Sequence, residues 1–276
     1  MSLLMLSLGC LAVGERPEGT DLDGPWRWVG TASNTICGVN TARKMACVSS
    51  DSGQPIWRKL HKDFVQLDGV CGVTDDGEVS CLGAAFGDDG WIQDSPIGNR
   101  FVSVKLSADD AACAIRDDDS ARCWAKDNIS ERISDQPESL VASVISSDFG
   151  GGITPDGELA VWGDSPSLNF FYNAPLTDIA TDGTDMVFIN DEDAWDLNSG
   201  SRIRRAGGIK LEAEAGTFCS MAESGMAMCW GEDDYGQAQQ PDATFRDIDV
   251  STNFACGVTD NQRIRCWGDA KSFPFE

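Results

Sequence analysis

Histidine is almost absent from this chain: His61 is the only one among 276 residues. A Ser-His-Asp or Cys-His arrangement would have to use it, and no nucleophile elbow lies near it, so we interpret His61 as a solvated loop residue. A phosphate-binding loop is also missing, because Gly150-Gly151-Gly152 has no Gly-Lys-Ser/Thr continuation. No carboxylate spacing singles out the acid pair of a glycoside hydrolase. The sequence therefore predicts a protein that is not an enzyme, without catalytic residues or cofactors.

Basic residues are scarce as well. The chain has 21 Lys and Arg against 45 Asp and Glu, a formal net charge of -24. Such a surface repels nucleic acid and anionic lipid, so we expect no nucleic-acid partner. Beyond the N-terminal segment, no stretch approaches the ~18 apolar residues of a membrane span.

Motifs for metal ions are missing too. None of the four acidic clusters has the spacing of an EF-hand loop, and most lie at predicted hairpin turns, where Asp forms local backbone hydrogen bonds. Cysteine pairs of the C-x2-C kind, typical of zinc sites, do not occur. We therefore predict no metal site and assign the clusters to turn chemistry. They are Asp75-Asp76, Asp117-Asp118-Asp119, Asp191-Glu192-Asp193 and Glu232-Asp233-Asp234.

What the chain does have is a regular set of cysteines. Ten of its eleven cysteines form five pairs with partners ten positions apart: Cys37 with Cys47, Cys71 with Cys81, Cys113 with Cys123, Cys219 with Cys229, and Cys256 with Cys266. A fixed spacing that recurs along a chain indicates a repeated supersecondary unit. Gly151 and Val161 keep the spacing in a unit without cysteines, and Val187 marks a unit from which the pair has been lost.

The cysteine spacing fits a β-hairpin. Between Cys71 and Cys81, Asp75-Asp76-Gly77 suits a three-residue loop whose last residue is left-handed, and Gly157 and Gly225 take the same place in their units. Counted outward from that turn, Cys71 faces Cys81 at a non-hydrogen-bonded pair, where Cα atoms approach to about 4.5 Å. A disulfide accepts that distance. We therefore predict five disulfides, each within one hairpin.

Seven units of about 36 residues account for the chain after residue 25. Each begins with alternating apolar and polar residues, the pattern of a half-buried strand, and none has the pattern of a long amphipathic helix. The predicted first residues are Trp26, Phe64, Phe101, Leu140, Leu176, Ile209 and Phe245. Trp124, Trp162, Trp230 and Trp267 recur at one repeat position, and we predict that they fill gaps between sheets.

Small sheets of three or four strands cannot bury both faces alone, so these units must stack. We predict an all-β fold, a seven-bladed β-propeller over residues 21–276, in preference to an open solenoid. Units of this length have room for four strands. Residues from Asp21 to Trp28 are expected to complete the last blade and close the ring.

Residues 1–20 are predicted to be a leader and a tether. Five regular disulfides favour an exported protein, because disulfides persist in oxidising compartments. The apolar run from Met1 to Gly9 ends at Cys10 and resembles a bacterial lipoprotein signal with Cys10 as the lipidated residue; an ordinary signal peptide is the alternative. We expect a secreted protein, or one held in the bacterial cell envelope by a lipid anchor at Cys10 as its only membrane contact.

The repeats resemble those of a known family. Ala255-Cys256-Gly257-Val258-Thr259-Asp260, followed by Ile264-Arg265-Cys266-Trp267-Gly268, is similar to the repeat of the regulator-of-chromosome-condensation family of seven-bladed propellers. Gly231-Glu232-Asp233-Asp234-Tyr235-Gly236-Gln237 resembles the family's glycine-glutamine loop. The paired cysteines look like those of secreted and surface-anchored bacterial members. The resemblance implies the fold more firmly than the function, because members include nucleotide-exchange factors and enzyme inhibitors.

Binding through loops is the class of function that the sequence favours, because the connecting loops build the faces of a propeller. Aromatic loop residues anchor protein interfaces or stack on sugars. The candidates are Phe170, Phe171, Tyr172, Trp91 and Tyr235. We expect a monomer that binds an extracellular or periplasmic protein as an inhibitor or interaction scaffold. A glycan-binding or cell-wall-binding module is the first alternative, and a regulator like the nucleotide-exchange factors is the second.

Overall fold

The computed structural model describes residues 25–49, 56–82, 100–107, 111–125, 137–145, 149–163 and 175–270. Within these ranges the regular elements are the strands β1 to β22, which confirms the prediction of an all-β chain. The same ranges contain no helix with the length and apolarity needed to cross a membrane.

Each strand pairs antiparallel with a neighbour in sequence, so every unit is a small meander. The strands are β1 (Trp26–Ala32), β2 (Thr35–Asn40), β3 (Lys44–Ser49), β4 (Ile56–Asp68), β5 (Cys71–Thr74), β6 (Val79–Cys81), β7 (Phe101–Ser107), β8 (Ala111–Arg116), β9 (Ala121–Ala125), β10 (Ala142–Ile145), β11 (Phe149–Ile153), β12 (Leu159–Gly163), β13 (Asp178–Thr181), β14 (Met186–Ile189), β15 (Asp193–Asp196), β16 (Arg202–Arg204), β17 (Lys210–Glu214), β18 (Thr217–Met221), β19 (Ala227–Gly231), β20 (Phe245–Val250), β21 (Phe254–Thr259) and β22 (Ile264–Gly268).

One long strand joins the first two units. The first residues of β4 pair with β3, and its last residues, from Phe64 to Asp68, pair with β5. The strands β1 to β6 therefore form one continuous sheet, whereas the later units each have a sheet of their own.

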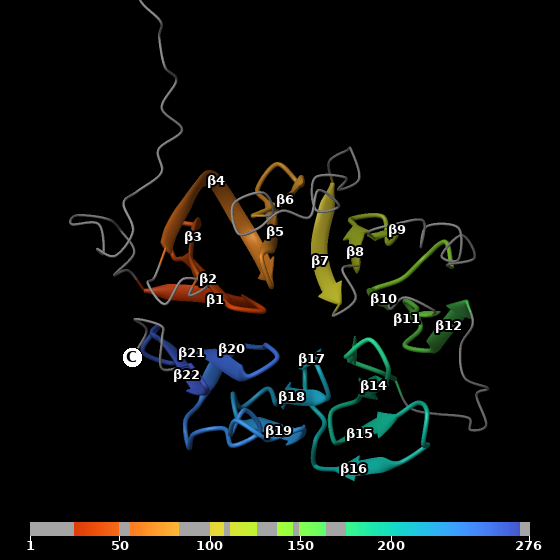
Figure 1. The fold of residues 1–276 in the computed structure, drawn as a ribbon. Coiled ribbons are helices and arrows are strands. Elements are labelled where there is room, and N and C mark those ends of the chain that lie inside the picture. Colours follow the sequence, from red (N-terminus) through yellow and green to blue (C-terminus); the bar gives the residue numbers. More distant parts are fainter. Residues whose placement is uncertain are drawn as a thin grey trace, which may run out of the picture.

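The sheets pack face to face around a common axis, with the first strand of each unit innermost (Figure 1). The second strand of each unit is almost wholly buried, as expected where both faces of a sheet are covered. Each hydrophobic cluster combines side chains from two neighbouring units. One cluster joins Trp26 and Val29 of the first unit to Phe254 and Val258 of the seventh, so the first and last units pack on each other.

A repeated backbone hydrogen bond also joins neighbouring units. The residue that opens a unit donates its N–H to the carbonyl oxygen of a hairpin-turn residue with positive φ in the preceding unit, over 2.7–3.1 Å. The pairs are Phe64 to Arg43, Phe101 to Gly77, Leu140 to Asp119, Leu176 to Gly157, Phe245 to Gly225 and Trp26 to Gln262. The last of these pairs joins the first unit to the seventh.

Glycine is needed at one of these turns for two reasons. Gly225 has a φ of +82°, and a Cβ on it would lie 2.6 Å from the carbonyl oxygen of Phe245. We expect Gly225→Ala to lower the free energy of unfolding by about 2–3 kcal/mol, because the side chain adds a backbone clash to left-handed strain.

Gly236 provides the matched control for this prediction. Its φ is also +82°, but the closest heavy atom to an added Cβ would be 4.0 Å away. Gly236→Ala should therefore cost only about 1 kcal/mol, the left-handed strain alone. Urea unfolding of the two variants measures the difference, and equal losses would show that the clash at Gly225 is relieved at no cost.

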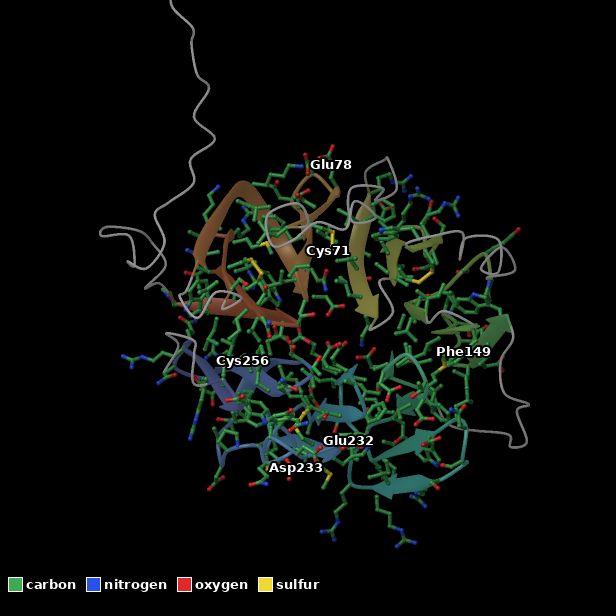
Figure 2. The ribbon with its side chains drawn as sticks, viewed as in Figure 1. Cys71, Glu78, Phe149, Glu232, Asp233 and Cys256 are labelled. Carbon is green, nitrogen blue, oxygen red and sulfur yellow. A yellow bond between two sulfur atoms is a disulfide. The ribbon has the colours of Figure 1, made fainter. Side chains whose placement is uncertain are left out.

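All five predicted disulfides are present, each within one hairpin and with Cα atoms 4.0–4.1 Å apart (Figure 2). In each pair the two cysteines lie directly opposite one another on the second and third strands, so the predicted register is confirmed. The bridges join Cys37 to Cys47, Cys71 to Cys81, Cys113 to Cys123, Cys219 to Cys229 and Cys256 to Cys266.

The predicted turn glycines and one of the two units without cysteines also follow the predicted hairpin geometry. The three turn glycines predicted to be left-handed have φ between 79° and 82°. In the fourth unit Gly151 lies opposite Val161, as the ten-residue spacing predicts. In the fifth unit Val187 lies opposite Asp196, only nine positions away, so this hairpin has lost the spacing as well as the cysteines.

The recurring tryptophans fill the gaps between sheets, as predicted. Trp124, Trp162 and Trp267 are buried in clusters shared by two units, and Trp230 is half-buried against the cluster between the fifth and sixth units.

Two other predictions are wrong. Trp26 and Trp28 belong to β1 and pair with β2 of the first unit, so they do not complete the last blade; the contact with that blade is made by sheet packing and by the bond from Trp26 to Gln262. His61 lies inside β4 and not in a loop, because that connection is itself a strand. Among the described residues, a fourth strand is present in the first unit, from β4, and in the fifth, as β16. In the second, third and fourth units, the segment that follows the third strand lies outside the described residues.

Ile209 does not open the sixth unit. Its N–H donates to the carbonyl oxygen of Met221, just as the N–H of Val141 donates to that of Ile153. Ile209 is therefore the second residue of its unit and Gly208 the first. Accordingly, the Ile209 side chain is 51% exposed instead of buried between sheets.

Candidate functional site

Most of the aromatic residues predicted to bind a partner lie where the structure gives no description. Tyr235 is the exception: it is 53% exposed in the loop after β19, where its N–H donates to Oε1 of Gln237. The predicted residues outside the described ranges are Phe170, Phe171, Tyr172, Trp91 and the proposed lipidation site Cys10.

Three of the four acidic clusters form local hydrogen bonds at their turns, as predicted; in the fourth, Asp193 lies in β15 and instead binds Arg202 and the N–H of Arg205. The carboxylate of Asp76 accepts a hydrogen bond from the hydroxyl of Thr74, and Asp118 accepts one from the N–H of Ser120. These bonds lower the pKa of both carboxyl groups. Asp233 accepts a hydrogen bond from a backbone N–H of its own loop.

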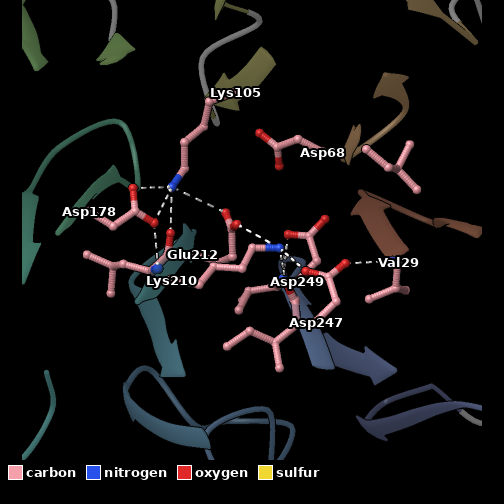
Figure 3. A network of polar contacts seen from close by, with 12 residues as sticks. Val29, Asp68, Lys105, Asp178, Lys210, Glu212, Asp247 and Asp249 are labelled. Atoms are coloured by element: carbon pink, nitrogen blue, oxygen red, sulfur yellow. Dashed lines mark hydrogen bonds and ion pairs between the residues drawn. The ribbon is translucent and has the colours of Figure 1, made fainter. Parts of the chain in front are cut away.

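A different group of charged side chains meets at the axis (Figure 3). Each occupies the third or the fifth position of its unit, so the repeat brings them to two neighbouring levels of the innermost strands. We call this group the axial cluster. Its members are Asp68, Lys105, Asp178, Lys210, Glu212, Asp247 and Asp249.

The aspartates of the axial cluster tie neighbouring innermost strands together. An innermost strand has an unpaired edge, and its N–H groups need acceptors. Oδ2 of Asp68 accepts the N–H of Leu106 from the next unit over 2.7 Å. Oδ2 of Asp249 accepts two, from Thr31 over 2.6 Å and from Gly69 over 3.2 Å, and so joins the seventh unit to the first two.

Two lysines neutralise part of this charge. Nζ of Lys105 lies 3.2 Å from Asp178 and 3.8 Å from Glu212. Nζ of Lys210 lies 3.2 Å from Glu212 and also pairs with Asp247. Burial by itself would lower the pKa of Lys210, but the carboxylates around it raise that pKa well above the usual value. Burial would likewise lower the pKa of Lys105, but its neighbouring carboxylates raise it, so both lysines stay charged.

Three carboxylates of the axial cluster also lie close to one another. Asp68, Glu212 and Asp249 are all buried, and each offers an oxygen within 4.8 Å of the other two. Burial, and next the charge of Glu212, raise the pKa of Asp68 to about 8. The same two causes, followed by the charge of Asp68, raise the pKa of Asp249 well above its usual value. These three residues have the oxygen chemistry to hold a cation.

A second candidate site lies at one end of the sheets. In each unit a hairpin turn joins the second strand to the third. These turns lie at the end of the sheets where the first strands begin, because the opening residue of a unit donates a hydrogen bond to the turn of the preceding unit. We call this end the turn face. Val102, Val141 and Ile209 each follow the opening residue of a unit and are 51%, 49% and 51% exposed. Met226, beside the turn of the sixth unit, is 64% exposed. Tyr235 follows the end of β19 and lies toward the opposite face.

Sequence reasoning missed both sites, although a signal for each was present. Asp68, Glu212 and Asp249 share the fifth position of their units, and Val102, Val141 and Ile209 share the second. Tabulating residues by repeat position, with Gly208 as the first residue of the sixth unit, would have revealed both sets.

No protein-family model and no curated protein sequence matches the chain. Its fold is similar to that of the CRINKLY WD40 ectodomain from the Arabidopsis thaliana receptor kinase ACR4, at 20% identity over 92% of this chain and 98% of that one, with a TM-score of 0.64. The ectodomain of the Physcomitrella patens receptor kinase CR4 is 19% identical over 87% and 72% of the two chains, with a TM-score of 0.60. The WD40 β-propeller domain of Doa1 is 15% identical over 95% and 97%, with a TM-score of 0.56. At these identities the likeness concerns the fold alone, and it is the fold of a β-propeller.

Proposed function

We propose that the protein is an exported, closed propeller of seven blades that binds another protein through its turn face and catalyses no reaction. β-Propellers commonly serve as interaction scaffolds, because loops on a rigid frame are free to vary. Closure is supported by the bond from Trp26 to Gln262 and by the cluster that packs the first unit on the seventh.

Export is supported by the five disulfides, which indicate an oxidising compartment. Two of the structures similar in fold are receptor ectodomains, which fits this location. Within the proposal, the chain belongs to the regulator-of-chromosome-condensation-like propellers, Cys10 carries the lipid anchor, and the protein is a monomer.

The observation that carries the binding proposal is the set of exposed apolar side chains on the turn face. Single exposed apolar residues are common on protein surfaces and need no explanation. Here Val102, Val141 and Ile209 project from the same position of three units, and Met226 is exposed on the same face. Apolar side chains gathered on one face are typical of a protein-binding surface.

The test compares variants on the two faces. The purified protein is immobilised, incubated with proteins released from the surface of the source cells, and its bound partners are identified by cross-linking and mass spectrometry. We expect the wild type to retain a partner. The variants Val141→Glu and Ile209→Glu should bind that partner at least about tenfold more weakly, because each substitution buries a charge in the interface. Tyr235→Glu, on the opposite face, is the control and should bind as the wild type does.

Three results would count against this proposal. Loss of the partner in Tyr235→Glu together with full retention in Val141→Glu and Ile209→Glu would move the interface to the opposite face. Binding on a glycan array, with no protein partner cross-linked, would favour the glycan-binding alternative. Reduced cysteines in the native protein would instead favour the nucleotide-exchange alternative, since they would remove the argument for export.

A further inference from the structure

We infer that the axis holds a binding site for one divalent cation of the calcium type, formed by the carboxylates of Asp68, Glu212 and Asp249 and the hydroxyl of Thr31. The three carboxylate oxygens lie within 4.8 Å of one another. Two oxygens bound to one calcium ion can be at most about 5 Å apart, so a single ion can contact all three. The inference is independent of the proposed protein-binding function.

Charge balance is the first argument for an ion. With all five carboxyl groups ionised, the axial cluster has five carboxylates against two ammonium groups, an excess of three negative charges (Figure 3). Among the described residues, neither Asp68 nor Asp249 has an ion pair with a lysine or arginine. Buried charge without compensation is costly, and a divalent cation would supply two of the three missing positive charges.

An unpartnered hydroxyl is the second, independent argument. Thr31 is only 5% exposed, and its Oγ1 has no hydrogen-bond partner among the described residues. Val29, two residues earlier in β1, packs against the seventh unit. Because residues two apart in a strand point to the same side, Thr31 also faces the unit that supplies Asp249. Its own N–H already donates to Asp249 over 2.6 Å, so the orphan hydroxyl belongs to a residue that contacts this carboxylate.

The chemistry of these donors selects the type of ion. All four are oxygen atoms, the ligands of hard cations such as calcium, whereas zinc prefers nitrogen and sulfur. A carboxylate has about four lone-pair sites, so Asp68 and Asp249 can bind an ion while accepting backbone N–H groups, and Glu212 can do so beside its lysines. The ion would connect four units, namely the first, second, sixth and seventh.

The first experiment measures the wild type. The protein is stripped with EDTA and dialysed, and its melting temperature is followed as calcium chloride is added at constant ionic strength. We expect a saturable rise in the melting temperature, and about one bound calcium per chain by atomic emission after gel filtration. Magnesium chloride at the same concentrations is the control and should give a smaller rise, because magnesium demands stricter octahedral geometry.

Thr31→Val separates an ion ligand from a structural residue. Valine has a similar shape, and the bond from residue 31 to Asp249 uses only the backbone N–H. We expect this variant to melt like the wild type, or slightly higher, in EDTA, because it removes an unsatisfied buried hydroxyl. Its calcium affinity by calorimetry should be about tenfold weaker.

Asp249→Asn and Glu212→Gln should abolish the calcium response. The matched control is Asp178→Asn, which changes a carboxylate of the same cluster outside the proposed site. It should lower the melting temperature in EDTA but keep the calcium-dependent rise. Each comparison is made within one variant, with and without calcium, so a general loss of stability does not imitate a loss of binding.

The inference is overturned if the stripped wild type neither binds calcium nor gains stability from it, which would mean that protons alone balance the axial charge. An unchanged calcium affinity in Thr31→Val, Asp249→Asn and Glu212→Gln together would also overturn it, because the ion would then bind elsewhere. Equal rises with magnesium and calcium would overturn the assignment to calcium. None of these results bears on the turn face.

Discussion

Reduction of the five disulfides is expected to unfold the protein at 37 °C, as it does for many small secreted domains. Each disulfide joins cysteines ten positions apart and so closes a loop of about eleven residues. In the chain-entropy account such a loop contributes up to ~3 kcal/mol by restricting the unfolded chain. The contribution of all five disulfides is comparable with the free energy of unfolding of a typical domain, which is roughly 5–15 kcal/mol.

The measurement is thermal unfolding by circular dichroism, with and without reductant and with alkylation of the freed thiols. The variant in which Cys71 and Cys81 are both alanine is the graded control, and should lose only about 2–4 kcal/mol. A reduced protein that melts at the temperature of the oxidised one would contradict the prediction. Peptide mapping under non-reducing conditions provides a separate check, since every bridge should lie within one hairpin.

Replacing Lys210 by methionine is expected to lower the free energy of unfolding by about 3–5 kcal/mol, the largest effect of any single substitution considered. The Lys210 ammonium contacts Glu212 and Asp247, and both carboxylates are almost fully buried. Methionine keeps most of the length and removes the charge, which leaves both carboxylates short of a cation in a medium of low polarity. Removing one partner of a buried ion pair is costly mainly because the other charge is left buried without a partner.

An exposed ion pair provides the matched control. Lys62 pairs with Glu78, and both side chains are about half exposed, at 51% and 50%. Lys62→Met should cost less than about 1 kcal/mol, because water already screens that pair. Denaturant unfolding in a calcium-free buffer gives both values. A loss in Lys210→Met as small as that in Lys62→Met would show that water reaches the axial cluster.

The hairpins could be predicted from the sequence because their constraints are local. A left-handed glycine at the turn and two cysteines at equal distances from it determine one register, and Cys71 lies opposite Cys81 as that register requires. The fold followed from the same pattern, because seven similar units without helices leave few ways to cover both faces of each sheet.

The axial cluster could not be predicted in the same way. Asp68, Glu212 and Asp249 come from three units, and only the stacking of those units brings them together. Ile209 also obscured the pattern, because taking it as the first residue of the sixth unit moves Glu212 to an even position. In a strand, a shift of one residue reverses the side to which every side chain points. The turn face was missed for the same reason.

The path of β4 makes the joints between wedges unequal. β4 passes from the first wedge into the second without interruption, so these two share a continuous ladder. The joint between Trp26 and Gln262, in contrast, relies on apolar contact and on a few isolated bonds. Among the described residues, no continuous strand connects the first wedge to the seventh. We therefore expect the first two wedges to move as one block, and the joint between the first and seventh wedges to open first.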